Sequence, residues 1–94
     1  MKRYKTRPGV VLTTIAGQNV LVAAKSLAAL CPYSAQINDT AAFCWRVLEE
    51  GADMDTLMNK LSGEYEIDDA AEARRDLEQL VAQMLESNYL IEES

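Results

Sequence analysis

The 94-residue chain contains no histidine and only two cysteines, Cys31 and Cys44. Without histidine, a zinc site lacks its usual ligands, and no imidazole is present to activate a thiol nucleophile. Two cysteines are also too few for a disulfide framework. We therefore expect both to be reduced, partly buried, small apolar residues with no metal-binding or catalytic role.

Long apolar runs and glycine-rich motifs are missing too. The most weakly polar stretch, residues 20–35, is interrupted by Lys25 and Pro32, which argues against a membrane span. No secretion signal follows the basic start, so we expect a cytoplasmic protein. Phosphate-binding loops, nucleophile elbows and calcium loops are absent from the sequence. These absences predict a binding protein that is not an enzyme and that needs no metal or cofactor.

The first part of the chain lacks acidic side chains, and the second part has few basic ones. Residues 1–38 carry five basic side chains and no acid, whereas residues 39–94 carry four basic and all fifteen acidic ones. Such an acidic second part repels a phosphate backbone, which argues against a nucleic-acid partner. Residues 1–8 are expected to form a basic N-terminal tail, either a solubilising terminus or a docking arm.

The region before residue 38 has the pattern of three strands. Residues 10–15 and 20–22 are rich in β-branched side chains and are separated by turn residues, which predicts a hairpin. Residues 25–30 could form a helical turn or an irregular link. Tyr33–Ile37 alternates between apolar and polar side chains, as a half-exposed third strand does.

Three amphipathic helices are predicted after these strands. The first begins at Asn38 or Asp39 and stops before Gly51, the second runs from Asp53 to Gly63, and the third runs from Asp68 or Asp69 to a left-handed turn at Asn88. This order predicts an α+β fold over residues 9–92. It would be a winged helix-turn-helix-like domain, in which a three-stranded antiparallel sheet is followed by three helices.

A diffuse but ordered series of residues then carries a family resemblance. It comprises Ile37-Asn38-Asp39-Thr40-Ala41-Ala42, Trp45, Leu48, Gly51, Leu57, Leu61, Tyr65, Asp76, Leu80 and Leu90-Ile91. In this series the chain resembles the PqqD-like family, the peptide-binding domains called RiPP recognition elements. The resemblance implies a chaperone-like adaptor that binds the leader segment of a ribosomally synthesised precursor peptide. It would present the peptide to a modifying enzyme, often of the radical SAM type.

Strand addition is the mechanism that this resemblance implies. The peptide would pair with the edge formed by Tyr33, Ser34, Ala35, Gln36 and Ile37, and the third helix would line the other wall of the groove. The expected helical contacts are Arg74, Leu77, Glu78 and Val81. Arg74 and Arg75 could hold an acidic leader, or they could instead form ion pairs within the helix. A second copy of the chain could equally cover the edge, giving a homodimer.

Two other functions use similar elements. A winged-helix DNA-binding transcriptional regulator would place the third helix in a major groove, but five acids surround the two arginines of that helix. A carrier protein with a phosphopantetheine arm would suit the size and acidity, but the sequence has no Asp-Ser-Leu attachment triplet. Peptide binding is therefore favoured, with neither nucleic acid nor membrane as a partner.

Overall fold

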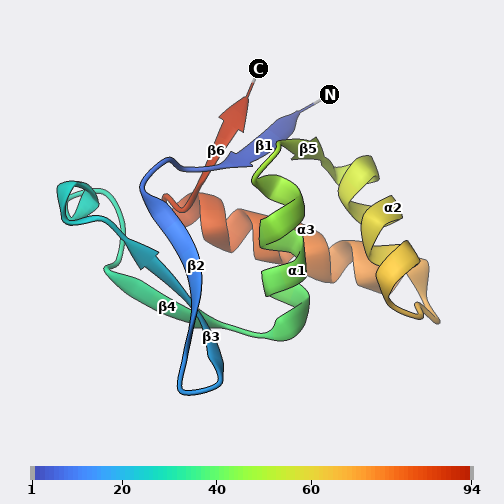
Figure 1. Ribbon diagram of the computed structural model, residues 1–94. Helices are drawn as coiled ribbons and strands as arrows, with labels where there is room; N and C mark the ends of the chain where they lie inside the picture. The colour runs from blue at the N-terminus through green and yellow to red at the C-terminus, as the bar shows by residue number, and fades with distance from the viewer. Residues whose placement is uncertain (1, 94) are drawn as a thin grey trace.

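The computed structural model describes residues 2–93 and arranges their strands in two antiparallel sheets (Figure 1). One sheet has the order β2-β3-β4 and the other the order β5-β1-β6. The strands are β1 (Arg3–Thr6), β2 (Val10–Ile15), β3 (Gln18–Ala23), β4 (Ser34–Ile37), β5 (Ala52–Asp53) and β6 (Leu90–Glu93). The helices are η1 (Lys25–Leu27), α1 (Asp39–Leu48), α2 (Met54–Glu64) and α3 (Ala70–Glu86).

The β2-β3-β4 sheet is the one that the sequence predicts. β2 and β3 form a hairpin closed by the pair Ile15 and Gln18. Between them, Ala16 and Gly17 have φ values of 52° and 78°. Two successive positive φ values give a type I′ turn, whose twist matches that of the flanking strands. β4 then pairs with β3, with Leu21 opposite Ala35, so the expected third strand is confirmed.

The β5-β1-β6 sheet was not predicted, and residues 3–6 are not the tail that we expected. β1 pairs with β6 along its whole length, from Arg3 opposite Glu93 to Thr6 opposite Leu90. The ion pairs Lys2–Glu92 at 3.5 Å and Arg3–Glu93 at 3.9 Å join the basic start of the chain to its acidic end. β1 has little strand signal of its own and depends on a partner almost ninety residues away.

Side-chain caps fix the start of each α-helix as the sequence predicts. Asn38, Asp53 and Asp69 are the N-caps of α1, α2 and α3, and each accepts from first-turn backbone amides. These bonds satisfy amides that have no partner inside the helix. Asn88, with φ 64°, makes the expected left-handed turn after α3. Gly63 does not end α2 as predicted, because the helix continues to Glu64.

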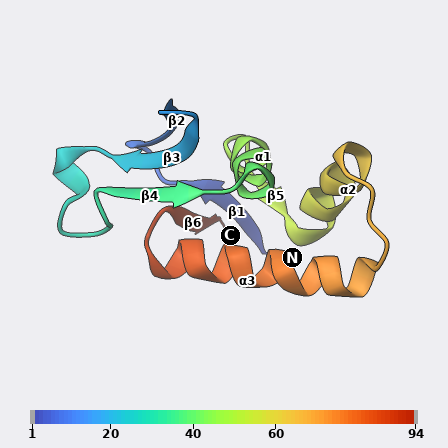
Figure 2. The same cartoon turned by 90° about the horizontal axis from the view of Figure 1, so that it is seen from below.

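The core lies where the three α-helices meet the inner face of the β2-β3-β4 sheet. Its largest fully buried side chains are Trp45, Leu21, Leu48, Leu57 and Leu90. Cys31 and Cys44 are free and buried, as the sequence predicts. Figure 2 shows β4 running alongside α3, with β3 and β2 successively farther from that helix. Among residues 2–93, no helix is both long and apolar enough to span a membrane.

Candidate functional site

β4 lies at the open edge of its sheet, beside α3. Ala23 N donates to Tyr33 O at 2.8 Å, so the odd-numbered residues of this segment direct their backbone groups toward β3. Hydrogen-bonded positions alternate along an antiparallel ladder. The N–H and C=O groups of Ser34 and Gln36 therefore point away from β3, where no strand of the described chain pairs with them. These four groups can receive an extended peptide.

A groove of about 170 Å³ separates this edge from the C-terminal half of α3. We call it the β4–α3 groove, and it is lined by Leu21, Ala35, Gln36, Ile37, Leu80, Gln83, Met84, Ser87 and Tyr89. None of these side chains is charged at neutral pH. Apolar carbon lines most of the groove, and a few amide and hydroxyl groups stand beside it, as is usual where a ligand is held mainly by apolar contact.

A second hollow adjoins the first through Leu80 and Gln83, which line both. This α1–α3 pocket has a volume of about 440 Å³ and is lined by Asn38, Thr40, Ala41, Leu61, Ala73, Asp76, Leu77, Gln79, Leu80 and Gln83. Asp76 is its single charged residue. The two hollows are therefore neighbours along α3.

Tyr89 fixes the end of the groove nearest the β3–β4 connection. Its hydroxyl donates to Pro32 O at 2.9 Å, and Asn88 Nδ2 donates to Leu30 O at 2.6 Å. Burial raises the pKa of the Tyr89 phenol, which keeps that hydroxyl protonated and able to donate. These bonds tie the residues before β4 to the end of α3 and hold the two walls of the groove at a fixed separation.

The predicted site residues divide into two groups in the structure. Tyr33 to Ile37 lie along the open edge, as the sequence predicts. Leu77 and Val81 are each only 3 % exposed and belong to the core. Leu77 forms part of the floor of the α1–α3 pocket, whereas Val81 lines neither hollow.

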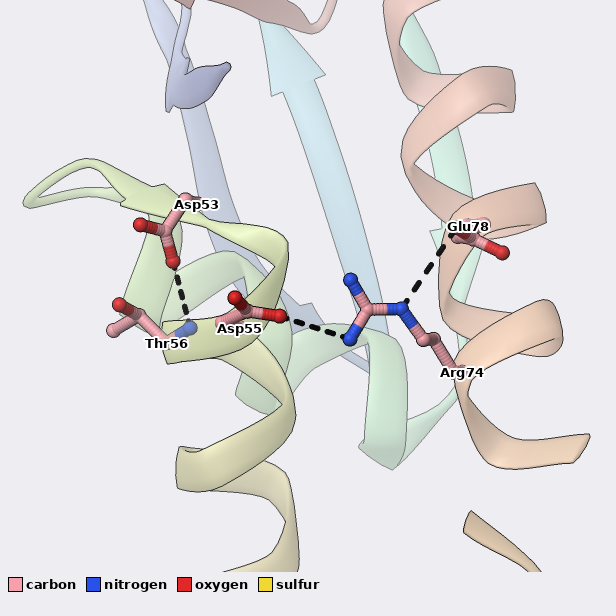
Figure 3. A network of polar contacts seen from close by, with 5 residues as sticks. All are labelled: Asp53, Asp55, Thr56, Arg74 and Glu78. Carbon is pink, nitrogen blue, oxygen red and sulfur yellow. Dashed lines mark hydrogen bonds and ion pairs between the residues drawn. The ribbon is translucent and has the colours of Figure 1, made fainter. Parts of the chain in front are cut away.

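Neither Arg74 nor Glu78 lines the β4–α3 groove, and Arg74 contacts α2 instead. Arg74 Nη1 is 2.9 Å from Asp55 Oδ1, and Arg74 Nε is 3.9 Å from Glu78 Oε2 (Figure 3). The pair with Glu78 is one of the ion pairs within the helix that the sequence allowed, whereas the shorter contact, with Asp55 of α2, was not predicted. The face of α3 that borders the groove is instead formed by Leu80, Gln83 and Met84. Leu80 and Met84 belong to the apolar stripe of this amphipathic helix, but helical periodicity alone does not show that they border a groove.

The site offers little apparatus for catalysis or metal binding. Burial raises the pKa of the Cys44 thiol to about 11, so it stays protonated at neutral pH, and its side chain is fully buried. Among residues 2–93, no three or more His, Cys, Asp or Glu side chains are placed so that together they could hold a metal ion. At the N-terminal end of α3, a shallow hollow is bordered by Glu66, Asp68, Asp69, Glu72 and Asp76. Phosphate groups would be repelled from this end of the helix.

One family model and two solved structures relate the chain to known proteins. The family model described as "Coenzyme PQQ synthesis protein D (PqqD)" matches residues 20–90. A solved structure titled "Lasso peptide synthetase B1 complexed with the leader peptide" is 26% identical, with a TM-score of 0.71, and covers 94% of this chain and 96% of that one. Another, "TbiB1 in Complex with the TbiA(beta) Leader Peptide", is 21% identical with a TM-score of 0.71, covers 92% of this chain and 93% of that one, and supports the fold alone. No curated protein sequence matches the chain.

Proposed function

This chain belongs to the PqqD family, and from that premise we propose that it binds the leader segment of a ribosomally synthesised precursor peptide. The leader adds a strand to β4, and the protein presents the remainder of the peptide to a modifying enzyme. The observation that carries this proposal is the open edge of β4 facing an uncharged groove. The 26% identical structure supports it, because that lasso peptide synthetase B1 is complexed with the leader peptide.

Backbone pairing gives the complex its geometry. The outward N–H and C=O groups of Ser34 and Gln36 can form up to four hydrogen bonds with an added strand, each contributing about 1 kcal/mol net. These bonds do not distinguish one peptide sequence from another. Ordering a flexible leader costs about 2–5 kcal/mol, which offsets most of that gain. Side-chain contacts in the groove therefore decide both the affinity and the choice of leader.

Apolar side chains of the leader supply the remaining affinity. Each apolar side chain that is fully buried contributes about 1.5–3 kcal/mol. Leu80 and Met84 on α3, opposite Ala35 and Ile37 on β4, give such anchors an apolar surface. We therefore place the leader contacts at residues 33–37 and at Leu80, Gln83 and Met84. Arg74, Glu78 and Val81, which the sequence alone suggested, lie outside this groove.

We propose that the protein acts by binding rather than by catalysis, and that its partner enzyme is of the radical SAM type and works with it in the cytoplasm. The winged helix-turn-helix interpretation also remains a prediction. The DNA-binding alternative is disfavoured by the acids at the start of α3.

A proline exchange tests strand addition directly. Gln36→Pro removes an N–H that points away from β3, so the sheet itself loses no ladder bond. Thr14→Pro, at the opposite edge of the same sheet, is the matched control. The probe is a fluorescein-labelled synthetic leader from the precursor peptide expected to be encoded beside this gene. We expect Gln36→Pro to weaken binding about fivefold, because one backbone hydrogen bond to the leader is lost, and Thr14→Pro to leave it unchanged.

Fluorescence anisotropy measures the binding, and circular dichroism confirms that both variants fold. Equal affinity of the Gln36→Pro variant and the unmodified protein would exclude β4 as the acceptor strand. No binding by the unmodified protein to that leader at millimolar concentration would reject the proposed function itself.

A further inference from the structure

The β2-β3-β4 sheet carries no charged side chain, in a protein with a net charge of −6. From Pro8 to Asn38 the sequence has a single charged residue, Lys25, which lies in η1. All fifteen acidic residues follow Asn38 and therefore lie outside this sheet. A second negatively charged copy would thus meet no acidic side chain on the strands of this sheet.

β2 forms the second open edge of this sheet, opposite β4. Ala24 N donates to Gly9 O at 2.8 Å, so the odd-numbered residues of β2 direct their backbone groups toward β3. The N–H and C=O groups of Leu12 and Thr14 consequently point outward. Within the described chain, no strand pairs with this side of β2.

The side chains of β2 do not protect this edge. Natural sheets usually guard an open edge with lysine, proline, a bulge or a covering segment. β2 has the sequence Val-Val-Leu-Thr-Thr-Ile, and all six of its residues pair with β3 in continuous register. Val11 is 56% exposed and Ile15 is 55% exposed, both on the sheet face that points away from the core. An edge of this composition favours pairing with another strand.

We propose that two copies of this protein pair antiparallel through β2, about a two-fold axis, and form one six-stranded sheet. A second copy fits because it presents the same uncharged, β-branched strand, and a two-fold axis brings each surface onto itself. A basic partner would be drawn to the acidic helices rather than to this edge. The contact of two six-residue strands is smaller than a standard interface of about 1,600 Å², so the dimer depends on concentration.

This arrangement leaves both peptide sites free. β4 lies at the far edge of each sheet, so the order across the dimer is β4-β3-β2 followed by β2-β3-β4 of the second copy. One dimer then presents two leader peptides, one at each end of the shared sheet. The pairing itself does not depend on the proposed peptide binding; only this consequence does.

Sedimentation velocity of the protein alone, from low micromolar to millimolar concentration, tests the pairing. The weight-average mass should rise from 10.4 kDa toward twice that value. Thr14→Pro removes an outward N–H of β2 and should weaken the association at least about tenfold. Gln36→Pro, at the β4 edge, should leave the association unchanged. The two proline variants thus have opposite effects on self-association and on leader binding.

Three results would overturn the proposal. They are a protein that stays monomeric at every concentration, an undiminished dimer of the Thr14→Pro variant, and dissociation by Gln36→Pro, which would place the contact at β4. Thermal unfolding followed by circular dichroism shows whether each variant is folded, and Val11→Lys is a second test on the same strand if Thr14→Pro fails to fold. Failure of the dimer is distinguishable from failure of the proposed function, because the sedimentation test uses no peptide.

Discussion

Leu80→Ala should weaken leader binding while leaving the fold largely intact. Leu80 is partly buried and borders both the β4–α3 groove and the α1–α3 pocket. The substitution removes three carbon atoms, worth about 0.8 kcal/mol each when fully buried. Most of that surface is already covered in the free protein. Binding should therefore lose somewhat less than about 1 kcal/mol, which corresponds to an affinity about two- to fivefold weaker.

Val81→Ala is the matched control, since Val81 follows Leu80 on the same helix but is only 3 % exposed and lines neither hollow. It should lower the free energy of unfolding by about 1–3 kcal/mol and leave the affinity of the folded protein unchanged. Anisotropy titration of a labelled leader gives the affinity, and urea unfolding gives the stability. If Val81→Ala weakened binding as much as Leu80→Ala, the assignment of the groove to this face of α3 would be refuted.

Four further outcomes are expected. Burial raises the pKa of the Cys44 thiol from 9.0 to about 11, so the free energy of unfolding should fall as the pH rises from 9 toward 11, whereas below pH 9 the stability that this group contributes is complete. Urea unfolding at several pH values should show a smaller decrease in this range for Cys44→Ala. Asp69→Ala removes the cap that accepts from two amides of α3 and should cost about 1 kcal/mol of stability, whereas Asp68→Ala should cost much less. Trp45 Nε1 is buried with no hydrogen-bond partner among residues 2–93, so Trp45→Phe should change stability by no more than about 1–2 kcal/mol, because losing the unpaired donor offsets part of the cavity cost. Leader affinity should vary little with salt because the groove is uncharged, and a steep salt dependence in titrations would indicate that a charged residue such as Arg74 contacts the peptide.

Local signals in the sequence predicted much of the fold. Side-chain oxygens at Asn38, Asp53 and Asp69 mark the helix starts because each can accept from neighbouring amides in its own segment. The alternation in Tyr33–Ile37 likewise reflects one buried and one exposed face of a single strand. Signals of this kind depend on a few adjacent residues, so they can be recognised without knowledge of the rest of the molecule.

The missed features depend on distant partners. β1 has one apolar residue, Tyr4, and it becomes a strand through its pairing with β5 and β6. The basic residues that suggested a tail find their acidic partners, such as Glu92 and Glu93, at the other end of the chain. No pattern within residues 3–6 contains that information, because the pairing is established only in the folded molecule.

Dependence on distant partners also explains why the sequence did not identify the face of α3 that borders the groove. An apolar stripe along α3 includes Leu77, Leu80, Val81 and Met84, and helical periodicity places all of them toward the interior. Which of these residues borders a groove depends on where β4 ends and on how closely α1 and α2 approach α3. The sequence of α3 alone contains neither piece of information. The sequence could therefore predict that a strand and this helix border a groove, but not which residues of the helix line it.

The half of α3 that contacts α2 carries charged side chains, whereas the half that faces β4 carries none. Between Ala70 and Glu78 the helix carries five charged side chains, and Arg74 of this half is paired with Asp55 of α2. From Gln79 to Leu85 it carries none, and this is the part that faces β4. A charged residue here would lie against an uncharged strand edge, and an incoming peptide would have to desolvate it at a cost. The uncharged half of α3 therefore suits burial by a peptide, while the charged half keeps the opposite end of the helix in contact with water.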